Sequence, residues 1–468
     1  MCTHLKTSVS ISRLESGQAP APSRRRRPPR LPGAAILCFS IIALAVLSHL
    51  LSFQTAISAI REAGRWTPKP ASIAIFTITY FAFAIGRLPG FKIDRAGAAF
   101  IGASMMVAFG VLPLADAYRA IDFDSITLLL GVMIVVANLR LSGFLRFASR
   151  AIVKHAQRPL TLLIAVVALS GVLSAFLVND TICLAMTPLV LDLAIQTKRK
   201  PLPYLLAVAM ASNVGSLATI TGNPQNMIIG SVSHISYGRF VALLSPVAAV
   251  GLLLITVMIS LAYPSEFLTR ERLAYDLSPI RSDKTLMVRS ALISIAMVAA
   301  FFAGVVPARA AIVAGAAMLL TRRIECEKIY QEIQWTLLLM FIGLFIVVAG
   351  LEKNILTPQL IAGIGQWHLE NAAALSVVTA IISNVVSNVP AVLVLKPFLA
   401  SVRDQQKAWL IIAMASTLAG NFTLLGSVAN LIVAQGAQAR AVRISFWDYF
   451  KVGAPLTVIT IALGVLWL

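Results

Sequence analysis

Two stretches of the chain repeat each other over 22 residues. The segment AMASNVGSLATITGNPQNMIIG at positions 209–230 aligns without a gap on AMASTLAGNFTLLGSVANLIVA at positions 413–434, and eight positions are identical. A composition this apolar would give about two identities by chance. Both segments interrupt lipophilic sequence with Gly, Asn and Thr, and a broken helix that recurs in both halves of a membrane protein is a strong indication of a transporter's binding site. We therefore expect two related halves, each with a helix interrupted at the same place.

The composition indicates that the chain is embedded in a lipid bilayer. Hydrophobic residues make up 58% of the 468 positions and charged residues 12%. Apolar runs of about 18 to 25 residues recur along the chain, and such runs span a bilayer as helices because a helix satisfies its own backbone polar groups. The composition thus predicts an all-α membrane protein and excludes a water-soluble domain. Four scattered cysteines have no metal or redox spacing, so we expect them to be unpaired packing residues.

The net charge of +20 indicates orientation and not nucleic-acid binding, because Lys and Arg lie in a basic tail and in short loops between apolar runs. We expect residues 1–31, which end in RRRRPPR, to form a disordered cytoplasmic tail. The remaining organisation follows from the apolar runs: an extra N-terminal transmembrane helix and loop at 32–69, a first transport repeat at 70–265, a cytoplasmic linker at 266–286 and a second transport repeat at 287–468.

The distribution of Lys and Arg indicates two re-entrant hairpins. The basic loops stay on one side of the bilayer only if the segments near 160–196 and 370–400 enter and leave on the same side. Their tips match, since each has Ser five residues before Asn179 or Asn388 and Pro nine residues after it. Cytoplasmic charge flanks the first hairpin and the charge-poor side flanks the second. The sequence therefore predicts two inverted structural repeats, each with a re-entrant hairpin and a broken transmembrane helix.

Two further features support this organisation. The apolar run around Gly131 resembles the run around Gly343, and VVA follows each glycine at the same spacing. Basic residues recur at every fourth position of residues 144–158, opposite an apolar face. This spacing predicts an interfacial amphipathic helix that leads into the first hairpin.

Polar side chains gather at the four interruptions. Unwound backbone is tolerated at membrane depth only where protein or a water-filled cavity satisfies it, so two tips and two breaks should meet at one polar cavity. Half-helix N-termini attract anions there, and exposed carbonyl groups hold Na⁺ or another cation. A lone Asn, Ser or Thr in a membrane helix is more often an interhelical hydrogen-bond partner than a ligand, but their recurrence at four related places favours a site. The expected substrate- and ion-binding residues are Asn179, Asp180, Thr181, Thr219, Thr221, Gly222, Asn223, Asn226, Ser387, Asn388, Thr423, Gly426, Ser427 and Asn430.

Asp180 is the carboxylate that the sequence places near the middle of the bilayer. A buried carboxylate among neutral ligands either binds a cation or takes up a proton. We therefore expect Asp180 to couple transport to H⁺ or Na⁺, with Na⁺ at the hairpin tips as the one metal to consider. Lys396 lies about 12 Å along a helix from Asn388, and Asp192 about 18 Å from Asp180. Both are expected to reach the membrane interface.

The motifs FLVNDTICLAMTP, TGNPQNMIIG and SNVVSNVPAVLVLKP resemble the ion transporter superfamily, in the branch of citrate-transporter-like permeases, arsenite permeases and related Na⁺/H⁺ antiporters. The resemblance covers residues from about 70 to the end. It implies inverted repeats that bind substrate and coupling ions between Asn-centred tips and broken helices, with Asn179 and Thr181 in one tip and Ser387 and Asn388 in the other. It also implies a homodimer. The tips Val-Asn-Asp-Thr and Ser-Asn-Val-Pro are more similar to those of arsenite permeases than to the Ser-Asn-Thr tip of dicarboxylate carriers.

Together these features predict a secondary active transporter of the inner membrane, with its N-terminus in the cytoplasm. The expected substrate is a small anion or oxyanion of the di- or tricarboxylate, inorganic anion or arsenite class, moved by alternating access coupled to H⁺ or Na⁺. A Na⁺/H⁺ antiporter and an anion channel of the same fold are the alternatives. We expect no cofactor and no enzymatic activity, because the motifs GxxxxGK[ST], HExxH and GxSxG do not occur. The expected partners are membrane lipid, a small anionic or neutral oxyacid and a second copy of the chain, without nucleic acid; an external ATPase subunit is a further alternative.

Overall fold

The computed structural model describes residues 68–85, 93–153, 156–269, 272–273, 283–320, 324–355 and 370–468. The predicted tail at 1–31, nearly all of the predicted extra helix and loop at 32–69 and most of the predicted linker at 266–286 lie outside these residues. Every regular element in the described part is a helix. Seven of the described helices are long and apolar enough to cross a membrane: α2 (Pro68–Ile85), α5 (Phe123–Leu141), α7 (Pro159–Phe176), α11 (Tyr237–Ala262), α13 (Lys284–Phe302), α16 (Trp335–Ile355) and α22 (Phe446–Trp467). The chain is a multi-pass, all-α membrane protein, as the composition predicts.

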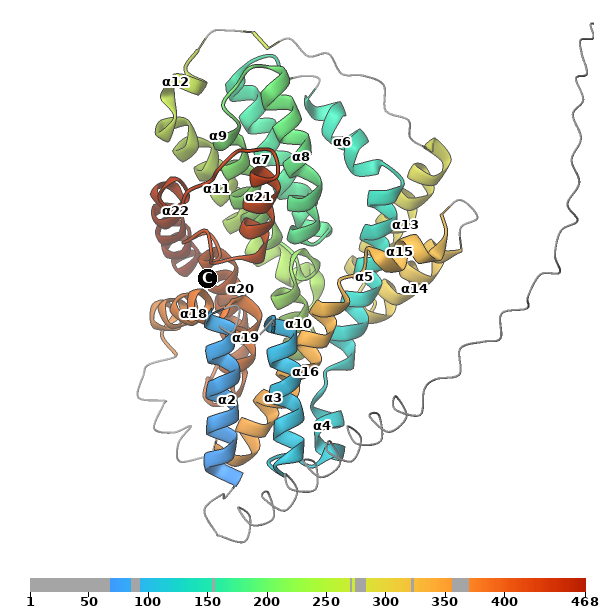
Figure 1. Cartoon of the computed structure of the whole chain (residues 1–468), viewed down its shortest axis with the longest axis vertical. Coiled ribbons are helices and arrows are strands. Elements are labelled where there is room, and N and C mark those ends of the chain that lie inside the picture. Colours follow the sequence, from blue (N-terminus) through green and yellow to red (C-terminus); the bar gives the residue numbers. More distant parts are fainter. Residues whose placement is uncertain are drawn as a thin grey trace, which may run out of the picture. The chain divides into compact units, whose positions relative to one another are not determined.

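The described helices form two bundles (Figure 1). The first bundle combines α2, α5, α13 and α16 with α3 (Arg95–Ala108), α4 (Leu114–Ala120), α14 (Pro307–Leu319) and α15 (Cys326–Gln331). The second bundle combines α7, α11 and α22 with α8 (Asn179–Gln196), α9 (Pro201–Ser216), α10 (Pro224–Ser233), α12 (Pro264–Phe267), α18 (Ala372–Val386), α19 (Asn388–Leu395), α20 (Gln405–Ala419) and α21 (Val428–Gln438). The bundles meet where α10 packs on α5, α16 on α19 and α18 on α2.

The first bundle pairs helices from one half of the sequence with helices from the other. Helix α5 packs on α13 and α14, and α16 packs on α2 and α3. A Cβ atom at Gly131 would lie 2.4 Å from the carbonyl carbon of Ala311, and one at Gly343 would lie 2.7 Å from that of Ala99. Only glycine allows helix backbones to approach so closely. The two glycines that the sequence pairs thus perform the same packing role in the two halves.

Two hairpins lie where the basic loops predict them. Leu177 and Val178 join α7 to α8, and Ser387 alone joins α18 to α19. The backbone φ angles of Val178 and Ser387 are +42° and +78°, a conformation that side chains other than glycine rarely adopt and that costs on the order of 1–3 kcal/mol. The hairpins therefore turn sharply and with similar strain just before their tip asparagines. Their re-entrant course stays a prediction.

The helix that leads into the first hairpin is shorter than predicted. The sequence predicts an amphipathic helix over residues 144–158, whereas α6 covers Phe144–Val153 and residues 156–158 are not helical. The predicted helix would run into Pro159, where α7 begins. Because the residue before a proline avoids helical dihedral angles, the helix has to end before this position.

Both predicted broken helices are present and are broken at aligned positions. Helix α9 ends at Ser216, and the chain continues through a short 3₁₀ turn, η1 (Ile220–Gly222), to α10. Helix α20 ends at Ala419, and α21 begins at Val428. The Asn226 amide donates to the carbonyl groups of Ser216 (3.2 Å) and Thr219 (3.0 Å). Asn430, its aligned counterpart, donates to the carbonyl groups of Gly420 (2.7 Å) and Thr423 (3.1 Å). Each asparagine satisfies carbonyl groups that the interrupted helix leaves free.

Candidate functional site

Asn213, on α9, lies at the centre of a buried polar cluster. Its Oδ1 accepts hydrogen bonds from Asn179 Nδ2 and Ser427 Oγ, both at 3.1 Å. Its Nδ2 donates to Asn421 Oδ1 and Asn430 Oδ1, both at 2.9 Å. An amide has two donor hydrogens and two acceptor lone pairs, so this side chain is fully used. Asn213 therefore joins the tip of the first hairpin to the break of the second half.

Thr417, on α20, occupies the position that aligns with Asn213 and makes the reciprocal contacts. Its hydroxyl group accepts from the Asn223 amide at 3.2 Å and lies 3.5 Å from Asn226 Oδ1. Asn223 and Asn226 align with Ser427 and Asn430, the residues that Asn213 contacts. Such an exchange of partners is expected of two elements related by a two-fold axis. Contacts alone do not fix that axis relative to a bilayer, so the inversion of the repeats stays a prediction.

Asn179 begins α8 at the first hairpin tip and is nearly fully buried. Its backbone carbonyl group accepts from Ser212 Oγ at 2.9 Å, and Ser212 Oγ lies 2.8 Å from Ser174 Oγ. Its side-chain Oδ1 is shielded from solvent and has no hydrogen-bond partner among the described residues. A buried amide oxygen without a partner is costly, and it is a suitable ligand for a cation or a hydroxyl donor. The structure thus leaves one acceptor unused at the predicted tip.

The second hairpin tip also lies beside the break between α20 and α21. Ser383 Oγ lies 2.6 Å from Asn388 Oδ1 and 3.2 Å from the Ser416 carbonyl oxygen. A Cβ atom at Gly420 would lie 3.5 Å from Asn388 Nδ2, and Gly420 is the residue whose carbonyl group Asn430 binds. Both tip asparagines are therefore linked to the break between α20 and α21.

The predicted residues of the first break are paired mainly with one another. The Thr221 hydroxyl group lies 3.2 Å from that of Thr219 and 2.9 Å from that of Tyr237, and Thr219 also donates to the Ala175 carbonyl group. Asn223 Nδ2 donates to Ser216 Oγ at 2.9 Å. A Cβ atom at Gly222 would meet the Ser216 carbonyl oxygen at 2.1 Å. These residues hold the unwound segment in shape, and their predicted ligand role is not tested by these contacts.

The remaining predicted residues differ in exposure. Gly426 is buried, and a Cβ atom there would lie 3.0 Å from Asn384 Oδ1. Ser387 and Thr423 are partly exposed. Asp192, which was expected at the membrane interface, lies 2.8 Å from Arg440, with both side chains about half exposed (51% and 50%). It lies away from the cluster and forms an exposed ion pair.

Asp180 and Thr181 follow Asn179 in the first turn of α8. The Asp180 side chain is 7% exposed, and no basic group forms an ion pair with it among the described residues. A carboxylate at the N-terminus of a helix is favoured by the helix dipole, but its burial without a countercharge is costly. The position therefore suits a proton or a bound cation. Thr181 lines a cavity of about 220 Å³ between the first hairpin and α5.

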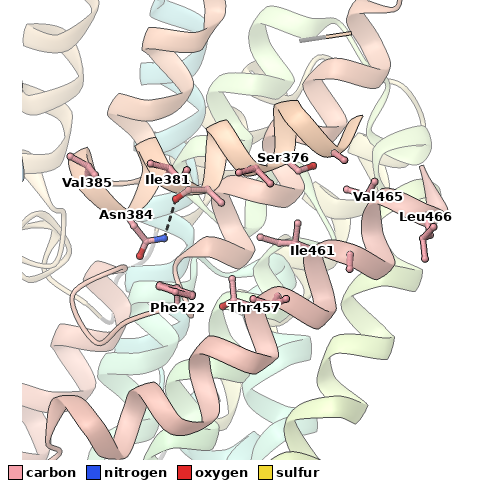
Figure 2. A pocket seen from close by; sticks show the side chains of 14 residues that line it. Ser376, Ile381, Asn384, Val385, Phe422, Thr457, Ile461, Val465 and Leu466 are labelled. Carbon is pink, nitrogen blue, oxygen red and sulfur yellow. Dashed lines mark hydrogen bonds between the residues drawn. The ribbon is translucent and has the colours of Figure 1, made fainter. Parts of the chain in front are cut away.

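A second, larger cavity is apolar. This lateral groove, of about 710 Å³, runs between α18 and α22, and Figure 2 shows Ile381, Val385 and Ile461 among its lining side chains. Asn384 also lines the groove, and its Nδ2 donates to the Ala380 carbonyl group at 3.0 Å (Figure 2). Its lining contains no charged residue. An ion would lose its hydration there without compensation, so the lateral groove is not the place for an anionic substrate.

Several residues of the cluster were not predicted as site residues. Asn213, Asn421 and Thr417 all lie inside the 22-residue repeat; Asn213 and Thr417 align with each other, whereas Asn421 aligns with the apolar Leu217. The available indication is a polar side chain in the last turn of an apolar helix, as at Asn213 and Thr417, or in the break that follows, as at Asn421. Their partners lie about 200 residues away in sequence, so their convergence is visible only in the fold.

Several known proteins with similar sequences are named as transporters. A profile of the citrate transporter family matches residues 78–419. The silicon efflux transporter LSI3 of Oryza sativa subsp. japonica is 27% identical over 83% of this chain and 95% of its own length. The putative transporter arsB of Dictyostelium discoideum is 24% identical over 80% of this chain and 87% of its own. Among solved structures, the Alcanivorax borkumensis YdaH transporter is similar in fold, with a TM-score of 0.53 at 13% identity, covering 85% of this chain and 96% of that one.

Proposed function

The chain belongs to the citrate transporter family, and we propose from that premise that it is a secondary active transporter coupled to H⁺ or Na⁺. Its substrate is a small anion or oxyanion, of the di- or tricarboxylate, inorganic anion or arsenite class. The names of the relatives, which include a silicon efflux transporter and a putative transporter arsB, support a small solute of the inorganic class. The proposal places the protein in the inner membrane as a homodimer, with its N-terminus in the cytoplasm.

The observation that carries this proposal is the cluster around Asn213. It joins the first hairpin tip, through Asn179, to the break of the other half, through Asn421, Ser427 and Asn430. Amide and hydroxyl groups at unwound segments of buried helices are the ligands that transporters use for solutes and ions. A purely structural protein gains nothing from interrupting helices at aligned positions in both halves.

The two bundles provide a basis for alternating access. The cluster lies wholly in the second bundle, on α8, α9, α20, α21 and the break between α20 and α21, and that bundle meets the first mainly through α5, α16 and α2. A shift of one bundle against the other would expose the cluster to each side in turn while its own hydrogen bonds are kept. Rigid-body movement of this kind is a common form of domain rearrangement.

Asp180 supplies the coupling in this proposal. It is buried, adjacent to Asn179 and without a basic partner among the described residues. A bound H⁺ or Na⁺ would neutralise it, and the negatively charged substrate would then no longer be repelled. Loading of the ion and of the substrate are thereby linked.

A ligand screen followed by flux measurement tests the function. The purified protein is heated with dicarboxylates, citrate, inorganic oxyanions or arsenite, with and without Na⁺ and at several pH values. A true ligand raises the melting temperature by mass action, by an amount that grows with its concentration. The ligand is then offered to proteoliposomes, where we expect saturable flux that depends on the ion gradient. No stabilising ligand and no gradient-dependent flux would contradict the proposal.

A Na⁺/H⁺ antiporter is the second candidate, and it is favoured by the buried Asp180 carboxylate and by the unused Oδ1 of Asn179, the preceding residue. Both are oxygen ligands of the type that Na⁺ requires, and competition of H⁺ and Na⁺ for one carboxylate is sufficient for antiport. Proteoliposomes with an internal pH dye distinguish the two. Proton release on addition of Na⁺ without any anion supports the antiporter, whereas a strict need for an anion supports the first proposal. Flux that does not saturate indicates a channel of the same fold.

A further inference from the structure

We propose that the cavity between α5 and the first hairpin is an entry vestibule through which the substrate reaches the asparagine cluster, and that Arg140 selects anions there. We call this cavity, which is lined by Arg140, Val178, Thr181 and residues 331–334 among others, the anteroom. This inference rests on the proposed function and deepens it, because it assigns a negative charge to the substrate. It names a cavity and a basic residue outside the predicted site. The argument depends on where the cavity lies, which groups line it and how Arg140 is held.

The anteroom lies between the two bundles. One wall is the C-terminal part of α5, which ends with Arg140 and Leu141, together with the segment 331–334 that precedes α16. The other wall is the first hairpin, with Val178 and Thr181 on either side of Asn179 and Asp180. A solute in this cavity of about 220 Å³ is thus adjacent to the tip of the hairpin. The volume suits a small oxyanion or carboxylate and not a larger metabolite.

Arg140 is held in the anteroom by a carboxylate. Its Nη1 donates to Glu332 Oε2 at 2.5 Å, and the side chains of Arg140 and Glu332 are 36% and 26% exposed. A guanidinium group has five N–H donors, so this bond leaves donors for a second oxygen ligand. Planar recognition of carboxylate and oxyanion groups is the chemistry for which arginine is best suited. Glu332 therefore positions Arg140 without using all of its donors.

The charges near the first hairpin tip explain why a basic side chain is needed in the anteroom. Glu332 and Asp180 would together repel an anion that approaches the tip, and Arg140 is the basic residue among those that line the anteroom. The neutral polar groups around it, Thr181 and the amides of Gln331 and Gln334, can hydrogen-bond an anion but cannot attract it from a distance. A cleft lined by one sign of charge concentrates ions of the opposite sign by about tenfold or more, and Arg140 offsets the negative charge that Glu332 would otherwise give this cavity. Arg140 thereby determines which solutes enter.

The other ion pairs among the described residues do not line the anteroom. Arg440 and Asp192 lie 2.8 Å apart with half-exposed side chains, and neither residue lines the anteroom or the lateral groove. Exposed pairs of this kind contribute little to stability. The Arg440–Asp192 pair is therefore a matched control, because the same substitution can be made there without altering the anteroom.

Charged thiol reagents test the inference without knowledge of the substrate. Gln334, in the wall of the anteroom, is replaced in a Gln334→Cys variant. Position 334 lies in the tryptic peptide 329–353, which contains no other cysteine, so its labelling can be followed by mass spectrometry with the native cysteines in place. The probes are two methanethiosulfonates, one with a sulfonate group and one with a trimethylammonium group. The measured quantity is the ratio of their reaction rates at this peptide.

Four substitutions test this ratio. Arg140→Gln should lower the preference for the sulfonate reagent by about tenfold, and Arg140→Lys, which keeps the charge, should retain most of it. Glu332→Gln should raise the preference, because it removes the negative charge beside Arg140. Arg440→Gln should leave the ratio unchanged. A ratio that Arg140→Gln leaves unchanged, as Arg440→Gln does, would overturn the inference.

Flux measurements separate the inference from the function on which it rests. In proteoliposomes, Arg140→Gln should raise the KM for an anionic substrate about tenfold while the maximal rate stays near that of the Arg440→Gln control. Wild-type flux of an anion that Arg140→Gln does not change would overturn the inference and leave the proposed function intact. Wild-type flux of a neutral oxyacid only would also overturn it. The absence of any flux from the wild-type protein would overturn both.

Discussion

At the scale of single residues, the central feature is an asparagine whose four hydrogen-bonding positions are all used. Asn213 lies on α9, and its partners come from the first hairpin tip and from the break between α20 and α21. Removing such a residue leaves several buried polar groups without partners, and each such group costs about 1–3 kcal/mol in proteins. Within a membrane the effect is smaller, because polar groups find other partners in the unfolded state.

We predict that Asn213→Ala lowers the free energy of unfolding by about 1–3 kcal/mol and abolishes binding of the substrate. The measurement is the melting temperature in detergent with and without the ligand found in the screen. Asn138→Ala is the matched control, since Asn138 is an equally buried asparagine on α5 whose Nδ2, among the described residues, donates to the Ile134 carbonyl group of its own helix alone. The control should keep the ligand-dependent rise in melting temperature. Unaltered ligand stabilisation of Asn213→Ala would contradict the assignment of the site.

The sequence indicates some of this cluster and not the rest. Asn179, Ser427 and Asn430 could be predicted because they lie at a tip or a break that recurs in both halves. Asn421 could not, because its aligned residue in the first copy is Leu217, which is apolar. Asn213 could not be recognised as the central residue, because hydrogen bonds between residues 208 and 217 positions apart depend on how the two halves pack.

At the scale of elements, close backbone contacts hold the first bundle together. Helix α5 approaches α14 at Gly131, and α16 approaches α3 at Gly343. The existence of these helices and the pairing of the two glycines follow from the hydropathy pattern. Which helix each glycine contacts does not follow from it, because α5 belongs to one half of the sequence and α14 to the other. Periodicity reports on a helix's own faces and not on its neighbour.

We predict that Gly131→Ala destabilises the protein by about 1–3 kcal/mol, the usual effect of forcing an extra carbon into a close-packed interface. Its added Cβ would lie 2.4 Å from the Ala311 carbonyl carbon. Gly315→Ala lies in the same interface, but its Cβ would lie 3.4 Å from Gly131 at an ordinary contact distance. The comparison is made by thermal unfolding of both variants in the same detergent. Equal melting temperatures would contradict the close approach of α5 and α14.

At the scale of the whole molecule, the account depends on two related halves that contribute to one site. Equivalent residues make equivalent contacts, as Asn226 and Asn430 do with the carbonyl groups of their own breaks. The all-α class and the positions of both breaks could be predicted from composition and the internal repeat. The division into two bundles could not, since it depends on which apolar faces pack together among many that are equally apolar. The opposite orientation of the halves across the bilayer is a prediction from loop charge alone.

The whole-molecule account also predicts how Asp180 behaves in transport. Its carboxylate is the buried acidic group beside Asn179, and coupling requires that it exchanges its ion as the substrate moves. Asp180→Asn keeps the size and most hydrogen-bonding capacity of the side chain and removes its charge. We therefore expect this variant to bind substrate but to lose ion-driven accumulation, while Asp192→Asn, in the exposed ion pair with Arg440, should transport as the wild type does.

Uphill transport in proteoliposomes tests the central claim most directly. The substrate concentration is first made equal on the two sides of the vesicle membrane. A gradient of H⁺ or Na⁺ is then imposed. The account predicts that the wild-type protein accumulates or expels the substrate against its own gradient, and that Asp180→Asn only equilibrates it. Equilibration by the wild-type protein under every imposed gradient, or the same uphill movement with Asp180→Asn, would contradict the account.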